Sequence, residues 1–249
     1  MSGKVYLVGA GPGAPDLLTI RAAEVLRRAD IVFHDALVHP GTIALAGRAE
    51  LVPVGKRSGK HSAAQRFINK RLVDAARKHA VVVRLKGGDP MMFGRAHEEI
   101  TALREAGMAY EVVPGVTAAL AASAEIGVSL TRRGIARSVV FLTPRVGVGE
   151  KPNDWARAAA AADTAVIYMG AGEAQAITEA LVAAGVAPST PVVVVENASL
   201  EDRQRFTFTL RNLPRIAEAA LKGPAVILLG EVYAEVEAQA LAQPHARYA

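Results

Sequence analysis

Apolar and polar positions follow two different periods along this chain. Short runs rich in Val, Ile and Leu, typical of buried strands, alternate with longer stretches whose apolar residues recur every three or four positions, as in amphipathic helices. This order predicts an α/β protein with a largely parallel sheet in each half. The expected strands are residues 4–8, 30–34, 50–54, 81–85, 110–113, 138–143, 164–168, 191–195, 205–210 and 225–229, and the expected helices include residues 16–28, 63–78, 97–106 and 174–184.

The chain is expected to fold as two domains. Pro114 and Gly115 interrupt the pattern near its middle, directly after the fifth expected strand. We therefore predict an N-terminal α/β domain over residues 1–115 and a C-terminal α/β domain over residues 116–249. Open α/β sheets bind their ligands beyond the ends of strands. Ligand-binding residues are therefore expected in the segments that follow the strands.

The composition narrows the class of protein. The chain has 249 residues, of which 51% are apolar and 21% charged, which is enough for an ordinary globular core. The absence of cysteine excludes disulfides, thiolate metal sites and a cysteine nucleophile, and the six histidines lack the spacing of a metal site, so no metal is expected. No apolar stretch is long enough to cross a membrane and no signal-peptide pattern precedes the first strand, so we expect a cytoplasmic protein.

The net charge bears on the kind of partner. The formal charge is +5, while aromatic residues make up only 5% of the chain and do not interleave with the basic ones. A stacking surface for nucleic acid is therefore not expected. A small substrate with several negative charges would use the same positive excess.

The first loop has an ambiguous glycine pattern. Gly9, Gly11 and Ala14 have the spacing of the loose dinucleotide-binding fingerprint. Pro12 removes an N–H donor from that loop, and Asp16 would repel a pyrophosphate docked at the following helix. The spacing alone leaves three interpretations open: a dinucleotide loop, a plain tight turn, or a loop for another ligand.

Charged residues stand at or after several other strands. Asp35 follows the second strand, where a carboxylate either caps a helix or faces a ligand. Arg84 and Lys86 interrupt the apolar fourth strand, directly before a Gly-Gly-Asp-Pro turn and a Met-Met-Phe run. A turn alone requires no cations on a buried strand, so this segment is the most informative of the chain. The loop after the third strand adds the cations Lys56, Arg57 and Lys60.

Taken in order, these segments resemble a known family. The motifs VYLVGAGPGAPDLLTIRA, DALV, VGKR, RLKGGDPMMFGR, VVPGVTA, YMG and VENAS are similar to those of the tetrapyrrole methylases, over roughly residues 3–233. The resemblance implies two α/β domains with a cleft between them, the class III methyltransferase fold, a homodimer and S-adenosylmethionine as methyl donor. It is strongest to stand-alone members that methylate uroporphyrinogen III at C2 and C7, giving precorrin-2 for sirohaem or cobalamin biosynthesis.

The resemblance also implies roles for individual residues. Asp35 matches a proton acceptor and Lys56 a proton donor. Cofactor-contact positions are matched by Pro12, Gly87, Gly88, Asp89, Met92, Thr117, Ala118, Met169 and Ala198. Because the implied substrate is a polycarboxylate, we expect cations to bind it, and the candidates are Arg57, Lys60, Arg84, Arg95, Arg132 and Arg133.

Three departures from the family pattern leave the particular tetrapyrrole substrate open. The usual FGRGGEE reads FGRAHEE with Ala96 and His97, PLTHR reads SLTRR with Arg132, and TGH reads TPR with Pro144 and Arg145. The alternatives are a methylase of a later precorrin, an NAD-dependent oxidoreductase that uses Gly9–Ala14, and a tetrapyrrole carrier without activity.

Overall fold

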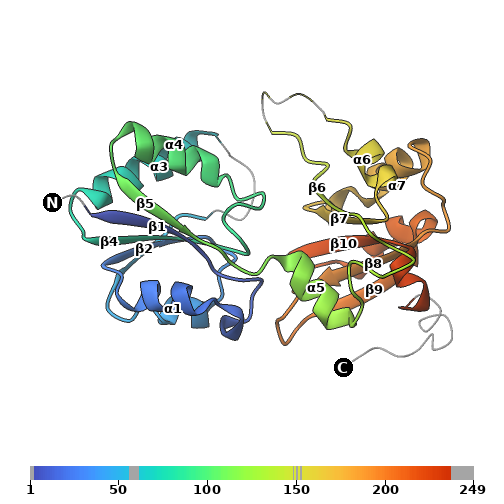
Figure 1. Cartoon of the computed structure of the whole chain (residues 1–249), viewed down its shortest axis with the longest axis horizontal. Coiled ribbons are helices and arrows are strands. Elements are labelled where there is room, and N and C mark those ends of the chain that lie inside the picture. The colour runs from blue at the N-terminus through green and yellow to red at the C-terminus, as the bar shows by residue number, and fades with distance from the viewer. Residues whose placement is uncertain (1–2, 56–61, 148, 150, 152, 237–249) are drawn as a thin grey trace. The chain divides into compact units, whose positions relative to one another are not determined.

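The chain forms two compact units that divide after Ala118. The computed structural model describes residues 3–55, 62–147, 149, 151 and 153–236 (Figure 1). The expected boundary at Gly115 lies close to this division. Each unit contains one five-stranded sheet covered by helices, as expected for an α/β fold.

The first unit is built on a parallel sheet with the strand order β3-β2-β4-β1-β5. Its strands are β1 (Lys4–Gly9), β2 (Ile31–His34), β3 (Glu50–Pro53), β4 (Val81–Lys86) and β5 (Ala109–Val113). Because all five strands run in the same direction, the segments that follow them gather at one edge of the sheet. That edge therefore contains the segments that follow β1, β2, β4 and β5, together with Val54 and Gly55 after β3.

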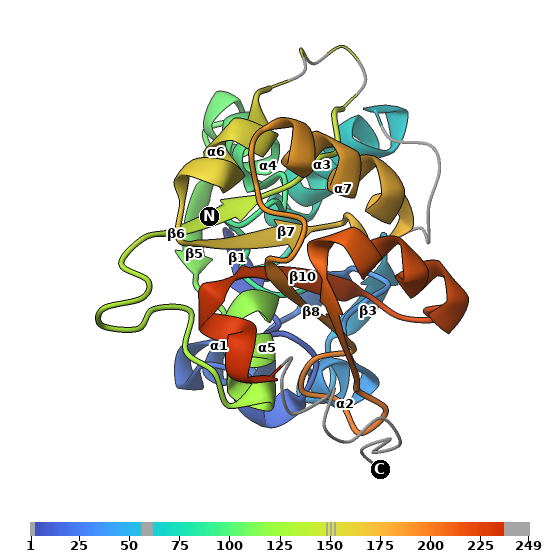
Figure 2. The ribbon, with the colours of Figure 1, turned by 90° about the vertical axis from the view of Figure 1, so that its right-hand side faces the viewer.

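Helices cover both faces of this sheet. Helices α1 (Ile20–Arg27) and α2 (Pro40–Ala44) pack with Tyr6, Val8 and Leu85 on one face. Helices α3 (Ser62–Ala76) and α4 (Ala96–Glu105) pack on the other face with Leu7 and Phe33 (Figure 2). Successive strand residues point to opposite faces, so Arg84 and Lys86, which alternate with Val83 and Leu85, point toward α3 and α4.

The first expected helix is interrupted in the structure. Residues Pro15–Leu17 form one 3-10 turn, Leu18 and Thr19 are extended, and α1 begins only at Ile20. The Thr19 hydroxyl caps α1 by accepting a hydrogen bond from the Ala22 amide at 3.2 Å. The glycine loop therefore does not run directly into the N-terminus of a helix.

The second unit has a mixed sheet, which corrects the expectation of a largely parallel one. The strand order is β6-β7-β10-β8-β9, and only the β6–β7 pair is parallel. The strands are β6 (Val139–Leu142), β7 (Thr164–Tyr168), β8 (Pro191–Glu196), β9 (Gln204–Thr209) and β10 (Ala225–Gly230). Strands β6, β7 and β8 nevertheless run in one direction, so their carboxyl ends share an edge.

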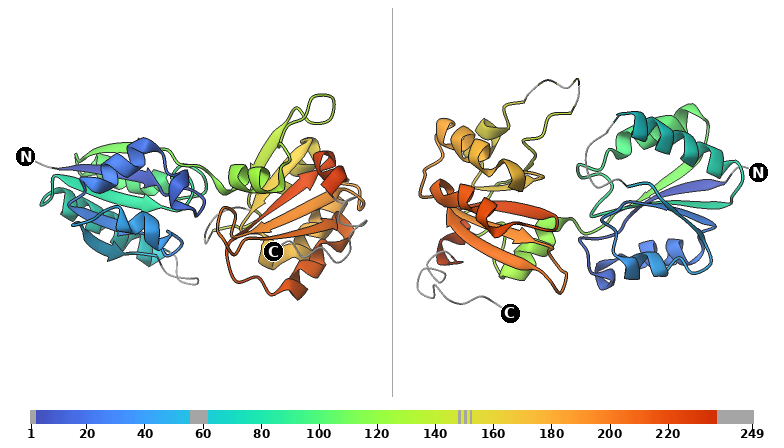
Figure 3. Two further views of the ribbon diagram at one scale, coloured as in Figure 1. Left: turned by 90° about the horizontal axis from the view of Figure 1, so that it is seen from below. Right: turned by 180° about the vertical axis from the view of Figure 1, so that it is seen from behind.

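Helices also cover both faces of the second sheet. Helix α5 (Ala118–Ile126) and the 3-10 turn η4 (Glu231–Tyr233) pack on one face with Val166 and Val195. Helices α6 (Trp155–Ala161) and α7 (Ala174–Ala183) cover the other face, together with the 3-10 segment η3 (Leu210–Ala219) (Figure 3). The remaining 3-10 turn is η2 (Ala171–Glu173).

Candidate active site

Three glycine-containing loops meet at the carboxyl edge of the first sheet. A Cβ atom on Gly9 would lie 2.6 Å from Gly115 Cα and 2.8 Å from the Gly88 carbonyl oxygen. Gly11 and Gly88 form a two-way backbone bridge, in which the Gly11 amide donates at 3.2 Å and the Gly88 amide at 2.7 Å. We call Gly9, Gly11, Gly88 and Gly115 the glycine junction. The close approach of these backbones accounts for the glycines at positions 9 and 11 of the first loop.

The carboxylate of Asp89 accepts hydrogen bonds from two backbone amides at this junction. One carboxylate oxygen accepts a hydrogen bond from the Gly115 amide at 2.9 Å, and the other accepts one from the Met91 amide at 2.7 Å. The side chain expected to contact a cofactor therefore holds two loops of the first unit in place. Gly87 beside it is exposed, and a Cβ there would meet only Leu37 Cβ, at 3.9 Å. A ligand can approach the backbone at Gly87.

Asp35 lies at the same edge, at the end of β2. The loop that follows β3 packs closely on it, because a Cβ on Gly55 would collide with the Ala36 amide and lie 3.0 Å from Asp35 Cα. The Val54 amide also donates to the His34 carbonyl at 3.0 Å. Gly55 thus brings the start of the VGKR motif against Asp35. Lys56, Arg57 and Lys60 lie outside the described residues.

A buried guanidinium holds the Asp35 carboxylate. Arg84 Nη2 donates to Asp35 Oδ1 at 2.5 Å, Arg84 Nε donates to Glu99 Oε1 at 2.8 Å, and Arg84 Nη1 donates to the Leu85 carbonyl at 3.1 Å. The side chain of Arg84 is 3% exposed and that of Asp35 is 30% exposed. Asp35 therefore presents a partly exposed carboxylate whose orientation is set from within the protein.

Two more buried side chains complete the cluster. Lys86 Nζ lies 3.2 Å from Glu99 Oε1 and 3.1 Å from Glu99 Oε2, and Gln65 Nε2 donates to Glu99 Oε1 at 3.3 Å. Arg84 and Lys86 carry two positive charges and Asp35 and Glu99 carry two negative ones, so the net charge of the cluster is zero. Removing one member of a buried ion pair leaves an uncompensated charge and typically costs about 3–5 kcal/mol.

The environment shifts the pKa of both cations. Burial lowers the pKa of Arg84, but the carboxylates of Asp35 and Glu99 outweigh it, so the pKa lies above its usual value. Burial is also the largest influence on Lys86, and the nearby Arg84 adds to it, so the pKa of Lys86 is lowered despite Glu99. Arg84 therefore stays charged beside Asp35 under all ordinary conditions.

The geometry corrects the expected role of Arg84. With three nitrogens bonded inside the protein and almost no exposed surface, its guanidinium is not available for a substrate carboxylate. Arg95 is exposed at the first turn of α4, where it forms a two-pronged ion pair with Glu98 at 2.6 and 2.9 Å. It remains a candidate for an anion on the first unit.

The second unit has its own strained edge. Met169, Asn197 and Ser199 follow β7 and β8 with φ of 57°, 51° and 74°, a region that non-glycine residues rarely adopt. Such strain clusters at functional sites. Met169 is 44% exposed, whereas Ala198 is buried in the core, so only the backbone of Ala198 can contact a ligand.

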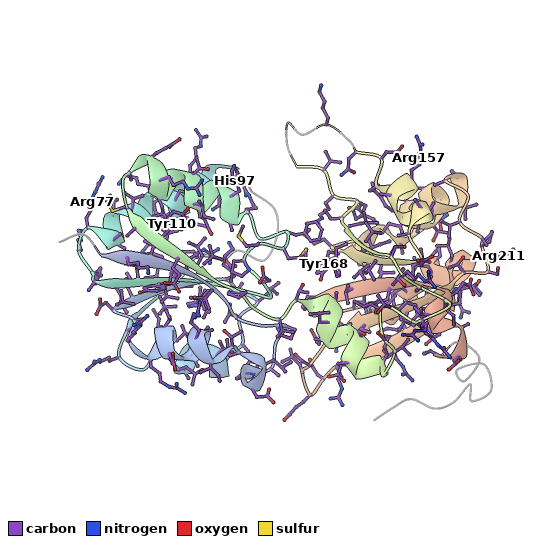
Figure 4. All side chains as sticks on the ribbon, in the orientation of Figure 1. Arg77, His97, Tyr110, Arg157, Tyr168 and Arg211 are labelled. Atoms are coloured by element: carbon purple, nitrogen blue, oxygen red, sulfur yellow. The ribbon has the colours of Figure 1, made fainter. Side chains whose placement is uncertain are left out.

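The start of α5 is fixed to this edge. The hydroxyl of Tyr168, the last residue of β7, accepts a hydrogen bond from the Ala119 amide at 3.2 Å (Figure 4). Thr117 and Ala118, which precede that amide, are half-buried, as are Pro12 and Met92 in the first unit. All cofactor candidates therefore lie at the carboxyl edges of the two sheets or at the start of α5.

Arg132 and Arg133 lie elsewhere, which corrects their expected place in the site. They belong to the loop that leads into the N-terminal end of β6, and Arg132 pairs at 2.8 Å with Glu235, which follows β10. Because β10 is antiparallel to β7, this is the opposite edge of the sheet from Met169. We therefore do not place these two cations at the edge that contains the cofactor candidates.

The departures from the family pattern have separate structural settings. Ala96 is the first residue of α4 and is buried in the core, while His97 is exposed on that helix (Figure 4). Alanine favours a helix more than glycine does, so this change suits α4. Pro144 and Arg145 follow β6 at the edge shared with Met169.

Sequence reasoning did not identify Glu99 or Gln65. A glutamate in the first turn of a helix is common because it suits the helix dipole, so Glu99 gave no signal by itself. The two cations on a buried strand were the usable signal, because buried charges require partners. Among the described residues, no group of three or more His, Asp or Glu side chains is arranged to hold a metal ion, and no described helix is both long and apolar enough to span a membrane.

Comparison with known proteins gives a consistent result. The family model described as Tetrapyrrole (Corrin/Porphyrin) Methylases matches residues 4–214. Siroheme synthase 1 of Klebsiella pneumoniae is 46% identical over 232 residues, which are 93% of this chain and 49% of that protein. Siroheme synthase of Pseudomonas fluorescens is 45% identical, over 93% of this chain and 50% of that protein. The chain thus spans about half the length of these curated relatives.

Solved structures show the same fold. Uroporphyrin III C-methyltransferase from Thermus thermophilus is 41% identical with a TM-score of 0.81, and the match covers 94% of this chain and 100% of that chain. The same enzyme has been solved in complex with S-adenosylhomocysteine, with 40% identity, a TM-score of 0.80 and the same coverage. A cobalt precorrin-4 methyltransferase is 30% identical with a TM-score of 0.81, over 92% of this chain and 95% of that one.

The glycine junction predicts a clear difference between two glycine-to-alanine variants. Gly9→Ala places a methyl group against the backbone of Gly115 and Gly88 and is expected to reduce the free energy of unfolding by about 1–3 kcal/mol. Gly87→Ala, where the new methyl meets only ordinary contact, is expected to change it by less than about 0.5 kcal/mol. Urea denaturation measures both, and equal losses would contradict this account of the junction.

Proposed function

Because the chain belongs to the tetrapyrrole methylases, we propose that it is an S-adenosylmethionine-dependent C-methyltransferase that converts uroporphyrinogen III to precorrin-2. The similarity to the Thermus thermophilus uroporphyrin III C-methyltransferase over that enzyme's full length supports the substrate. The observation in this chain that carries the proposal is the partly exposed carboxylate of Asp35, which is held by the buried Arg84. The product would serve sirohaem or cobalamin biosynthesis.

The proposed cofactor residues suit a ligand recognised through backbone groups. In the first unit, Gly87 offers exposed backbone, and Pro12, Met92 and Thr117 are half-buried. In the second unit, Met169 offers an exposed thioether side chain, and Ala198 offers backbone only. These residues, with Gly88, Asp89 and Ala118, are proposed to hold S-adenosylmethionine.

The chemistry assigns a proton transfer to Asp35. S-adenosylmethionine supplies, when bound, a methyl group already activated by its sulfonium sulfur. A pyrrole carbon of the substrate takes that methyl group, first at C2 and then at C7, and the ring becomes cationic until it loses a proton. The partly exposed Asp35 carboxylate accepts the proton, and a positioned base of this kind typically contributes 10²- to 10⁴-fold in rate, by an order-of-magnitude estimate. Lys56 is proposed as a proton donor.

The substrate carboxylates are proposed to bind cations of the first unit. Arg57, Lys60 and Arg95 are the candidates, because Arg84 is fully engaged inside the protein and Arg132 and Arg133 lie at the opposite edge of the second sheet. For Arg95, binding requires exchange of its ion pair with Glu98. The free-energy cost of that exchange is small, because exposed ion pairs contribute only about 0–1 kcal/mol to stability.

An anaerobic incubation with uroporphyrinogen III and S-adenosylmethionine, followed by mass spectrometry of the pigment, tests the function. Two added methyl groups are expected. No added methyl, with S-adenosylhomocysteine still bound, would reject this substrate. The 30% identity and TM-score of 0.81 to a cobalt precorrin-4 methyltransferase would then favour a later precorrin as the substrate.

The assembly is proposed from the family resemblance alone. We propose that the chain forms a homodimer in solution. Light scattering coupled to size-exclusion chromatography should give twice the mass of one 26.1 kDa chain. A mass equal to one chain would contradict this assembly.

Replacing the proposed proton acceptor should separate turnover from cofactor binding. Asp35→Asn is expected to lower kcat by about 10²- to 10⁴-fold because the amide cannot take the proton, while the Kd for S-adenosylhomocysteine stays within about twofold. Asp30→Asn is the matched control, since it makes the same change at the opposite end of β2, where the side chain only accepts a hydrogen bond from the Val81 amide. Unchanged kcat in Asp35→Asn would exclude Asp35 as the base.

Two variants of Met169 test the strained edge of the second unit. Because Met169 has a φ of 57°, Met169→Gly is expected to be more stable than Met169→Ala by about 1 kcal/mol. Both variants lack the thioether, so both should bind S-adenosylhomocysteine more weakly than the parent protein and to a similar extent. Thermal unfolding and calorimetric titration measure the two effects. Parent-like binding in both variants would remove Met169 from the cofactor site.

A further inference from the structure

Glu99 is the most enclosed charged side chain of the described residues and has no place yet in the chemistry. It is fully buried in the first turn of α4. Its Oε1 atom accepts from Arg84 Nε at 2.8 Å, from Lys86 Nζ at 3.2 Å and from Gln65 Nε2 at 3.3 Å. Three donors from two elements, β4 and α3, thus converge on one carboxylate oxygen.

The contact with Nε matters because of the shape of a guanidinium. The group is a rigid planar fork, so fixing Nε and one Nη fixes the direction of the other Nη. In Arg84, Glu99 holds Nε and the Leu85 carbonyl holds Nη1, which leaves Nη2 aimed at Asp35 Oδ1 at 2.5 Å. The direction of the donor that meets Asp35 is therefore set by Glu99 together with the Leu85 carbonyl, and Glu99 itself is fully buried.

We propose that Glu99 is a positioning residue that acts on the reaction through Arg84 by holding the guanidinium in the orientation that aligns Asp35. This proposal rests on the proposed function, in which Asp35 accepts the substrate proton. Misplacement of a reacting group by about 1 Å can cost on the order of 100-fold in rate. A loss of this size, without loss of substrate binding, is the expected signature.

Charge balance is the competing explanation for Glu99. Lys86 is buried and its pKa is lowered by burial, so Glu99 could be retained only to compensate that cation. Two double variants separate the explanations, because each removes both charges at once. Glu99→Gln with Lys86→Met keeps an oxygen acceptor for Arg84 Nε, whereas Glu99→Met with Lys86→Met removes it.

The two double variants should differ mainly in kcat. In the glutamine pair (Glu99→Gln with Lys86→Met), kcat is expected within about threefold of the parent; in the methionine pair (Glu99→Met with Lys86→Met), kcat should fall about 100-fold. The KM values for both substrates should stay within about twofold, and the methionine pair should have the lower Tm because the buried Arg84 Nε and Gln65 Nε2 lose their acceptor. Equal kcat in the two folded variants would overturn the proposal and leave charge balance as the role of Glu99.

A third variant covers the case in which the methionine pair, Glu99→Met with Lys86→Met, does not fold. Glu99→Asp keeps every charge but shortens the side chain by one methylene, so its carboxylate retreats from Arg84 Nε. We expect kcat to fall about tenfold with KM nearly unchanged. Parent-like kcat in Glu99→Asp would count against positioning.

An NMR measurement tests the support of Arg84 independently of activity. The Arg84 Nε–H signal, assigned by its absence in Arg84→Lys, should be protected from hydrogen exchange in the parent and in the glutamine pair. Protection should be lost in the methionine pair, or in Glu99→Asp if that pair does not fold. Persistent protection there would overturn the proposal. A parent enzyme that adds no methyl group would reject the proposed function, while this signal would still decide whether Glu99 holds the guanidinium.

Discussion

The buried guanidinium of Arg84 between two carboxylates is the interaction on which the candidate site depends. It exists because Asp35 directly follows β2, which pairs in parallel with the strand β4 that contains Arg84, while Glu99 reaches Arg84 from α4. A lone cation in this position would be too costly to bury, and a lone Asp35 would be free to turn. The three groups together give a partly exposed carboxylate with a fixed direction, which is what proton removal from a methylated ring requires.

Close backbone packing complements this electrostatic core. The glycine junction holds the loops after β1, β4 and β5 against one another, and Asp89 bonds to two of their backbone amides. In the second unit, the strained residues Met169, Asn197 and Ser199 follow strands that share one edge. In both units, regular strands support short irregular segments, and the irregular segments contain the residues proposed to bind the ligands.

The sequence predicted the strands well and their directions less well. Runs of Val, Ile and Leu placed all ten strands to within two residues at either end, because buried strands need such runs. The mixed second sheet was missed although a signal existed: residues 197–203 are too few for the crossover that a parallel β8–β9 pair would need. Glu99 could not be found from spacing, since its partners lie on β4 and α3. Arg132 and Arg133 were misplaced because charge alone does not say at which edge of a sheet a loop lies.

The central claim is that this chain transfers methyl groups to carbon on uroporphyrinogen III. The most direct measurement is ¹³C NMR of the pigment formed from uroporphyrinogen III and S-adenosylmethionine labelled in its methyl group. The account predicts two labelled methyl signals, at C2 and C7 of the ring. Label that stays on the sulfonium, or that appears at other ring positions, would contradict it.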